Sequence, residues 1–253
     1  MSAVISFTNQ KGGVGKTTSA VNVAACLAKR GKKVLLVDMD PQGNTTSGVG
    51  IGKKQVKSSV YDALIGAAAT EDTVITTKFK NLSIIPSTIS LAGAEFELQT
   101  LENREACAKK MLASVRDQYD YTIIDCPPTL GLLTINALVA SDGMIIPMQC
   151  EYYALEGLSQ LMISVKKIKK LYNPALQLTG ILLTMYNGRL ILTTQVVAEL
   201  KKYYGDKLFK VPITRSVKLS EAPGFGEPIC YYEPSGKSAL QYMAIAKELM
   251  LRI

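Results

Sequence analysis

Residues Asn9–Thr18 read NQKGGVGKTT, and this stretch decides how the rest of the chain is interpreted. An apolar run at about Val4–Thr8, typical of a buried strand, precedes it, and the segment Lys16–Lys29 after it has the spacing of a helix. Glycines between a strand and a helix let successive backbone N–H groups point at an anion near the positive end of the helix dipole. The stretch therefore predicts a loop that binds the phosphates of a nucleotide.

The side chains of this loop suit the same chemistry. The Lys16 ammonium can reach the β- and γ-phosphates, and the Thr17 hydroxyl can ligate Mg²⁺. The alternative is a glycine-rich turn that only caps the helix. If the loop binds phosphate, ATP and Mg²⁺ are the expected cofactors, and the residues expected at the nucleotide are Lys11, Gly12, Gly13, Val14, Gly15, Lys16, Thr17 and Thr18.

Short apolar runs alternate with helical segments along the rest of the chain. Strands are expected at about Val4–Thr8, Lys33–Val37, Leu82–Ile85, Tyr121–Ile124, Gly143–Pro147 and Leu178–Thr184. Helices are expected at about Lys16–Lys29, Ser59–Ile65, Leu101–Gln118, Leu133–Ala140, Ala154–Leu171 and Leu192–Tyr204, with a last one from the N-cap Ser235 to about Met250. The alternation predicts an α/β P-loop fold, a doubly wound and mostly parallel sheet with helices on both faces, as one domain over residues 1–253. Long loops are expected at Gly48–Lys57 and Val217–Ser235.

The composition limits the possible chemistry. Because the 253 residues include no histidine and only five scattered cysteines, acid–base and metal chemistry must use carboxylates, hydroxyls and amines. No apolar run approaches the ~20 residues of a membrane helix, and the N-terminus lacks the pattern of a secretory signal. We therefore expect a soluble cytoplasmic protein without a membrane partner. The formal charge of +8 makes polyanions plausible partners.

Three carboxylates follow strands of the predicted sheet. Asp38 and Asp40 come after one apolar run, and Asp125 comes after another. In a parallel sheet these strand ends meet beside the phosphate loop, so the three carboxylates should gather around a metal site. Mg²⁺ takes few direct protein ligands, which suggests direct ligation by Thr17 and contact through water for Asp38 and Asp125. The alternative for Asp38 and Asp40 is a structural Asp-x-Asp-Pro turn.

Basic residues are concentrated late in the chain. The helix expected at Ala154–Leu171 has an apolar stripe, which leaves four lysines between positions 166 and 170 on its exposed side. Arg189, Lys201, Lys202 and Lys218 follow within the next fifty positions. These basic residues are either a charged face in contact with solvent or a surface that binds a polyanion.

The loop departs from the ordinary G-x-x-x-x-G-K-[ST] pattern, since Gln10 stands at the position of the first glycine and Lys11 follows it. In this respect the chain resembles the deviant Walker A ATPases. Within that group it is similar to the ParA/Soj family of DNA-partitioning ATPases over essentially its whole length. The stretches that carry the resemblance are NQKGGVGKTT, LLVDMDPQGN, YTIIDCPP, IPMQCEYYALEGLSQL and KLSEAP.

The resemblance implies roles for particular residues. Lys11 is expected to cross the interface of an ATP-bound homodimer to the partner's phosphates, and Asp40 to orient or deprotonate the attacking water, so the catalytic residues are Lys11, Lys16 and Asp40. A second lysine on one loop would otherwise repel Lys16, and two facing subunits supply the balancing negative charge. Adenine is expected against Met185 and Pro212–Arg215.

The resemblance also implies partners. The dimer is expected to bind double-stranded DNA without sequence preference through Arg189 and Lys218, with Lys201 and Lys202 nearby, and to associate with the nucleoid. A ParB-type centromere-binding protein is expected to stimulate hydrolysis, which releases the DNA. The resemblance implies that this cycle of DNA binding and release serves chromosome or plasmid partition.

Two other members of the deviant Walker A group remain as alternatives. A membrane-positioning ATPase of the MinD type ends in a basic amphipathic helix, for which the last residues, AIAKELMLRI, offer little length. A reductase similar to the nitrogenase iron protein needs cysteines that bridge an iron–sulfur cluster, and Cys126 and Cys150 are a weak candidate pair.

Overall fold

A seven-stranded sheet forms the centre of the computed structural model, which describes residues 2–253. The strands lie in the order β3-β4-β2-β5-β1-β6-β7, and every neighbouring pair is parallel except β3 with β4. Their bounds are β1 (Ala3–Phe7), β2 (Val34–Asp38), β3 (Ile75–Thr76), β4 (Leu82–Ile85), β5 (Tyr121–Asp125), β6 (Gly143–Gln149) and β7 (Gln177–Thr184). The predicted mostly parallel, doubly wound sheet is confirmed, with the short edge strand β3 as an unpredicted addition.

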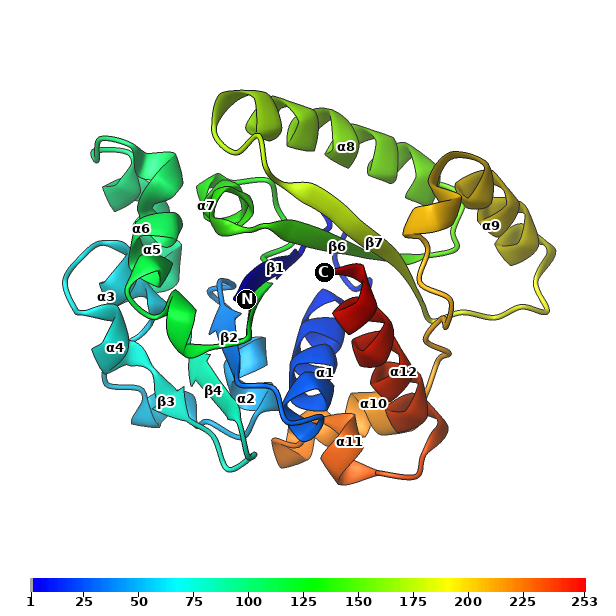
Figure 1. Ribbon diagram of the computed structural model, residues 1–253, viewed down its shortest axis with the longest axis horizontal. Helices are drawn as coiled ribbons and strands as arrows, with labels where there is room; N and C mark the ends of the chain where they lie inside the picture. The colour runs from blue at the N-terminus through cyan, green and yellow to red at the C-terminus, as the bar shows by residue number, and fades with distance from the viewer. Residues whose placement is uncertain (1) are drawn as a thin grey trace.

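Helices cover both faces of the sheet (Figure 1). The longer ones are α1 (Lys16–Lys29), α5 (Leu91–Leu98), α6 (Cys107–Ala113), α7 (Leu132–Ala140), α8 (Ala154–Leu171), α9 (Ile191–Tyr204) and α12 (Lys237–Arg252). The short ones are α2 (Asn44–Gly48), α3 (Val60–Leu64), α4 (Thr70–Thr73), α10 (Val217–Glu221) and α11 (Ile229–Tyr232). None of the helices in residues 2–253 combines the length and apolar character needed to span a bilayer.

Alternation along the strands divides the core between the two faces. Ile5 and Leu36 pack on one side with α1, α11 and α12, whereas Val4 and Leu35 pack on the other with α3, α5, α6 and α7. A third cluster joins β6 and β7 to α7, α8 and α9. Successive side chains of a strand point to opposite faces, so strands that are apolar at every position must be covered on both. This burial fixes the carboxyl ends of β1, β2 and β5 next to one another.

The helix expected at Leu101–Gln118 is wrong in extent. Only Cys107–Ala113 is α-helical, between 3₁₀ turns at Arg104–Ala106 and Arg116–Gln118. Asn103 has a left-handed backbone with φ 55°, which an α-helix cannot include. The side chain of Asn136 on α7 then accepts from the Ala108 N–H (2.9 Å) and donates to the Arg104 carbonyl (2.7 Å). A distant asparagine therefore helps fix where this helix begins.

Three further expectations are corrected. The last helix begins at Lys237 with Gly236, rather than Ser235, as its N-cap, and it ends at Arg252. The loop expected at Gly48–Lys57 contains the end of α2 and a 3₁₀ turn, and that expected at Val217–Ser235 contains α10, a 3₁₀ turn and α11. These pieces have at most five residues each, too few for a periodic apolar pattern to identify them.

Candidate nucleotide-binding site

The glycine-rich loop connects β1 to α1. Gly13 and Gly15 have left-handed backbones, with φ 72° and 83°, which a residue with a Cβ adopts only with strain. Two polar side chains from neighbouring strand ends hold the loop. The Thr184 hydroxyl donates to the Val14 carbonyl (2.7 Å), and the Gln149 amide donates to the Gly13 carbonyl (2.9 Å). Neither Thr184 nor Gln149 was expected from the sequence.

The two lysines of the loop have opposite environments. Lys16 is 6% exposed, and its ammonium donates to the Lys11 carbonyl (3.1 Å). Burial lowers the pKa of Lys16, while the nearby Asp125 carboxylate opposes that shift. The Lys11 side chain is 46% exposed and pairs with Glu151, just beyond β6. One lysine therefore faces into the loop, and the other lies at the surface of the subunit.

A cavity of about 380 Å³ opens over the loop. Its lining includes Asp40 and, from the loop and α1, Gly12, Gly13, Gly15, Lys16, Thr17 and Thr18. A smaller cavity of about 140 Å³ shares Gly15, Thr18 and Met185 with it and adds residues Ile213 to Ser216. The two adjoining spaces suit a phosphate chain followed by a base. Val14 is buried beneath the loop, and Pro212 is outside both linings, with its carbonyl accepting from Gln241 (2.8 Å).

The acidic residues gather as the strand order predicts. Asp38 and Asp125 are register partners at the ends of β2 and β5, and both side chains are fully buried. Burial, and then the Asp125 carboxylate, raise the pKa of Asp38 to about 7. Burial likewise raises the pKa of Asp125 to about 6, against the opposing hydrogen bonds of Thr45 and Thr17. Asp40 is only 8% exposed, but it lines the larger cavity.

Thr45 and Thr46, at the start of α2, were missed by the sequence analysis. The Thr45 hydroxyl donates to Asp125 (2.6 Å), and the Thr46 hydroxyl donates to Asp38 (2.7 Å). The run of polar residues after DMDPQG was the only available signal, and nothing in it indicates which carboxylate each hydroxyl reaches.

These groups fit Mg²⁺. Asp125 Oδ1 is buried without a hydrogen-bond partner, and Thr17 lines the larger cavity over the loop. Hard oxygen donors of this kind are those that Mg²⁺ prefers. Within residues 2–253, no three cysteine, aspartate or glutamate side chains lie close enough to hold one ion together. The donor set therefore suits an ion that keeps waters and phosphate oxygens among its ligands.

The predicted basic residues lie in three parts of the chain. Arg189 lies in the exposed connection between β7 and α9, and Lys201 and Lys202 occupy the last turn of α9. Lys218 is on α10, where it pairs with Glu221 (2.9 Å). In Figure 1, α9 lies at the upper right and α10 near the bottom, so these two helices do not form one compact basic patch.

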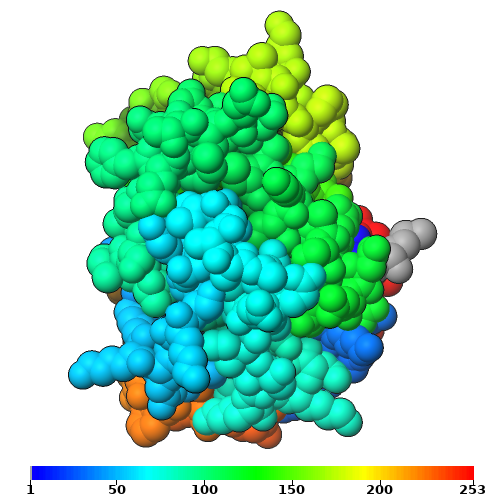
Figure 2. All heavy atoms as spheres, turned by 90° about the vertical axis from the view of Figure 1, so that its left-hand side faces the viewer, coloured from blue at the N-terminus to red at the C-terminus, as the bar shows by residue number. Residues whose placement is uncertain are grey.

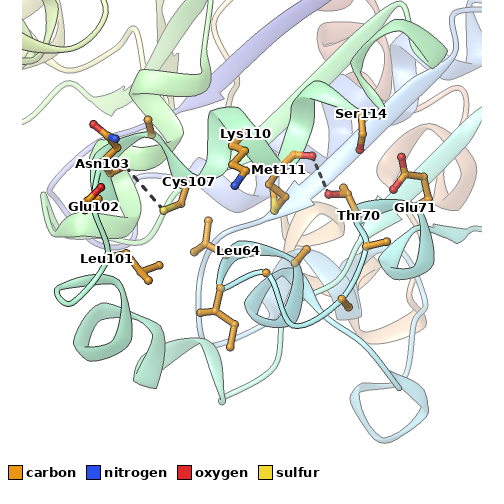
Figure 3. A pocket seen from close by; sticks show the side chains of 16 residues that line it. Leu64, Thr70, Glu71, Leu101, Glu102, Asn103, Cys107, Lys110, Met111 and Ser114 are labelled. Carbon is orange, nitrogen blue, oxygen red and sulfur yellow. Dashed lines mark hydrogen bonds between the residues drawn. The ribbon is translucent and has the colours of Figure 1, made fainter.

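A cavity of about 580 Å³ lies elsewhere. It lies between the α3–α4 connection and α6, and Leu64, Cys107, Lys110 and Met111 are among its lining residues (Figure 3). The cyan and green segments that form this part of the molecule face the viewer in Figure 2. None of the phosphate-loop residues lines it, and its wall is mostly apolar.

Comparisons with known proteins show the family of this chain. A family model described as an AAA domain matches residues 2–178. Over 249 residues the chain is 55% identical to the sporulation initiation inhibitor protein Soj of Bacillus subtilis (strain 168), with 98% of both chains covered. It is also 47% identical to the chromosome partitioning protein ParA of Myxococcus xanthus (strain DK1622), covering 98% of this chain and 88% of that one. The chain belongs to the ParA/Soj family of ATPases.

The fold of this ParA/Soj family member recurs in solved structures. One is described as cobyrinic acid a,c-diamide synthase from Mycobacterium smegmatis with bound ADP and magnesium. It has a TM-score of 0.87 and 34% identity, with 99% of this chain and 94% of that chain covered. The sequence resemblance to the ParA/Soj family is thus confirmed, and so is the P-loop ATPase fold.

Proposed function

We propose that this ParA/Soj family member, as one ATPase domain over residues 1–253, partitions DNA through an ATP-dependent switch. ATP joins two subunits, the dimer binds double-stranded DNA without sequence preference, and hydrolysis releases the DNA. The observation that carries the proposal is the contrast between Lys16, buried beside Asp125, and Lys11, exposed on the same loop. A loop that served one subunit alone would need only the inward lysine.

The residues of the site divide the work of hydrolysis. The N–H groups of the glycine-rich loop and the Lys16 ammonium bind the phosphates, and Met185 with Ile213–Ser216 surrounds the base. Magnesium, when bound, supplies positive charge against the phosphates. Thr17 would hold it directly, and Asp38 and Asp125 would act through its waters. Asp40, in the cavity lining, accepts the proton of the attacking water.

Lys11 would contact the nucleotide bound to a second subunit. Its side chain is about half exposed, and so is that of its present partner Glu151. An exposed ion pair of this kind contributes little stability, so a partner subunit's triphosphate can replace Glu151 at small cost. The γ-phosphate adds charge that ADP lacks, which ties the dimer to ATP.

DNA binding follows from the same switch. In one subunit the basic residues of the β7–α9 region and of α10 are separate, and a weak set of phosphate contacts results. A dimer places the basic residues of two subunits on one surface. DNA affinity rises because more phosphates are contacted at once. A ParB-type protein at a centromere-like site would accelerate hydrolysis, so that partition proceeds on the nucleoid.

One experiment tests the switch. The purified protein is titrated with a random-sequence duplex in the presence of ADP, ATP or a non-hydrolysable ATP analogue, over a series of salt concentrations, while molecular mass is followed by light scattering. We expect a dimer, and DNA binding that weakens with salt, only with the triphosphates. A dimer that ignores DNA but binds anionic vesicles would instead favour the MinD-type alternative.

A further inference from the structure

Two consecutive threonines at the start of α2 bond to the two buried carboxylates of the site. Thr45 Oγ1 donates to Asp125 Oδ2 (2.6 Å), and Thr46 Oγ1 donates to Asp38 Oδ2 (2.7 Å). All four side chains are fully buried. One short helix thus contacts the ends of two neighbouring strands, β2 and β5. We propose that Thr45 is a positioning residue that orients Asp125 for magnesium and so couples the metal site to the loop that carries Asp40.

The two carboxylates are held differently. Asp38 accepts from the Thr46 N–H (2.8 Å) and hydroxyl on one oxygen and from the Asp40 N–H (3.2 Å) on the other, so both of its oxygens are occupied. Asp125 keeps one oxygen, Oδ1, free of any partner although it is buried. Asp125 therefore offers a magnesium-bound water an oxygen with no other partner, whereas Asp38 offers only the second lone pair of Oδ1, which already accepts from the Asp40 N–H.

Thr45 determines how that free oxygen is presented. Rotation about the last bond of an aspartate is only weakly restricted by its own geometry. The Thr45 hydroxyl holds Oδ2, and so leaves Oδ1 in one orientation. A carboxylate near a metal that is fixed by a second hydrogen bond loses less freedom when the ion binds.

The same threonine pair anchors the Asp40 loop. Within this loop the Gly43 N–H donates to the Asp40 carbonyl and the Gln42 N–H to the Asp40 carboxylate, both at 2.9 Å. At its far end, Thr46 Oγ1 also accepts from the Ser87 N–H (2.9 Å), beyond β4. The loop is thus fixed to β2, β4 and β5, and a change at Asp125 reaches Asp40 through five intervening residues.

The test rests on the proposed function and uses substitutions at Thr45. Thr45→Val keeps the shape and removes the donor, while Thr45→Ser keeps the donor. Thr73→Val is the matched control, because the Thr73 hydroxyl is equally buried but donates to the Thr70 carbonyl, away from the carboxylates. For each protein the thermal stabilisation by ATP is measured against Mg²⁺ concentration, and ATP binding is measured separately in EDTA.

We expect the Mg²⁺ concentration for half of the ATP-dependent stabilisation to rise about 10- to 100-fold in Thr45→Val, as for other residues that orient metal ligands. Thr45→Ser and Thr73→Val should keep the wild-type value, and ATP binding in EDTA should be unchanged in all four proteins. Where Thr45→Val does not fold, Thr45→Ala replaces it.

Two results contradict the proposal in distinguishable ways. A wild-type Mg²⁺ requirement in a folded Thr45→Val or Thr45→Ala variant would overturn the role of Thr45 and leave the ATPase site intact. If the wild-type protein itself gains no magnesium-dependent stability from ATP, the proposed nucleotide site fails, and this role fails with it.

Discussion

At the scale of single residues, the site depends on charged side chains that are buried. Lys16 is enclosed by its own loop and donates to the Lys11 carbonyl. A phosphate oxygen is a better acceptor for an ammonium than a carbonyl, because the bond then joins two charged groups. Lys16 is therefore placed to exchange an internal contact for the nucleotide.

Lys16→Ala should weaken ATP binding by at least about 10- to 100-fold, since charge-assisted hydrogen bonds of this kind contribute roughly 1.5 to 3 kcal/mol. Isothermal titration measures the affinity, and circular dichroism checks the fold. Lys29→Ala, at the other end of α1, serves as the control helix substitution. An ATP affinity unchanged from wild type would rule out the assignment of this loop.

Asp40→Ala should slow hydrolysis by about 100-fold or more, which is the usual contribution of a general base. Because the loop and Lys11 are intact, the variant should still dimerise with ATP, and the dimer should persist. Light scattering after removal of free ATP measures its lifetime, with wild type as the comparison. Rapid turnover in this variant would remove Asp40 from the mechanism.

At the scale of elements, the parallel ends of β2 and β5 bring two carboxylates together out of water. Asp38 and Asp125 lie opposite each other in the register, and the pKa of each is raised, to about 7 and about 6. The unfolded chain has no such contact, so an aspartate there keeps an ordinary pKa near 4. The folded state therefore binds more protons between about pH 4 and pH 7, and stability from these groups falls as pH rises through that range.

Asp38→Asn should change the stability of the metal-free protein more favourably at pH 8 than at pH 5. The amide keeps an oxygen for Thr46 but cannot ionise, and its NH2 group cannot accept from the Asp40 N–H as Asp38 does. From pH 5 to pH 8 we therefore expect the stability of the variant relative to wild type to rise by about 1 kcal/mol or more, the equivalent of one pKa unit. Thermal unfolding in EDTA at several pH values measures it, with the exposed Asp72→Asn as control. A stability difference that does not change with pH would contradict the raised pKa of Asp38.

At the scale of the whole molecule, DNA binding is expected to require two subunits, because the basic residues of one subunit lie on separate elements. Arg189 follows β7, at one edge of the sheet, and its side chain is exposed. Lys80, also exposed, lies between β3 and β4 at the opposite edge. The two residues have the same charge and differ in location, so they form a matched pair.

Arg189→Ala should weaken binding of the ATP-bound dimer to a random duplex several-fold. It should also lower the slope of log affinity against log salt by about one for each lost phosphate contact. Lys80→Ala should change neither quantity, and neither variant should alter basal hydrolysis. Affinities and salt slopes measured by fluorescence anisotropy provide the check, and equal behaviour of the two variants would remove Arg189 from the DNA surface.

The sequence by itself determined the features that depend on near neighbours. A strand followed by glycines, a lysine and a helix predicts a phosphate loop wherever it occurs, and carboxylates after apolar strands must meet at one edge of a parallel sheet. The strands other than β3, most long helices and the grouping of Asp38, Asp40 and Asp125 were therefore predictable from local patterns alone.

Only the tertiary structure decided which distant groups meet. Thr45 and Asp125 are 80 positions apart, Lys11 and Glu151 are 140 apart, and Asn136 fixes the start of a helix 28 positions earlier. Such contacts depend on strand order and on how each helix crosses the sheet. The local sequence around a polar loop residue does not indicate which distant group it will bond to. The loop sequence determined what this site can bind, and the packing of the chain determined which side chains hold its carboxylates in place.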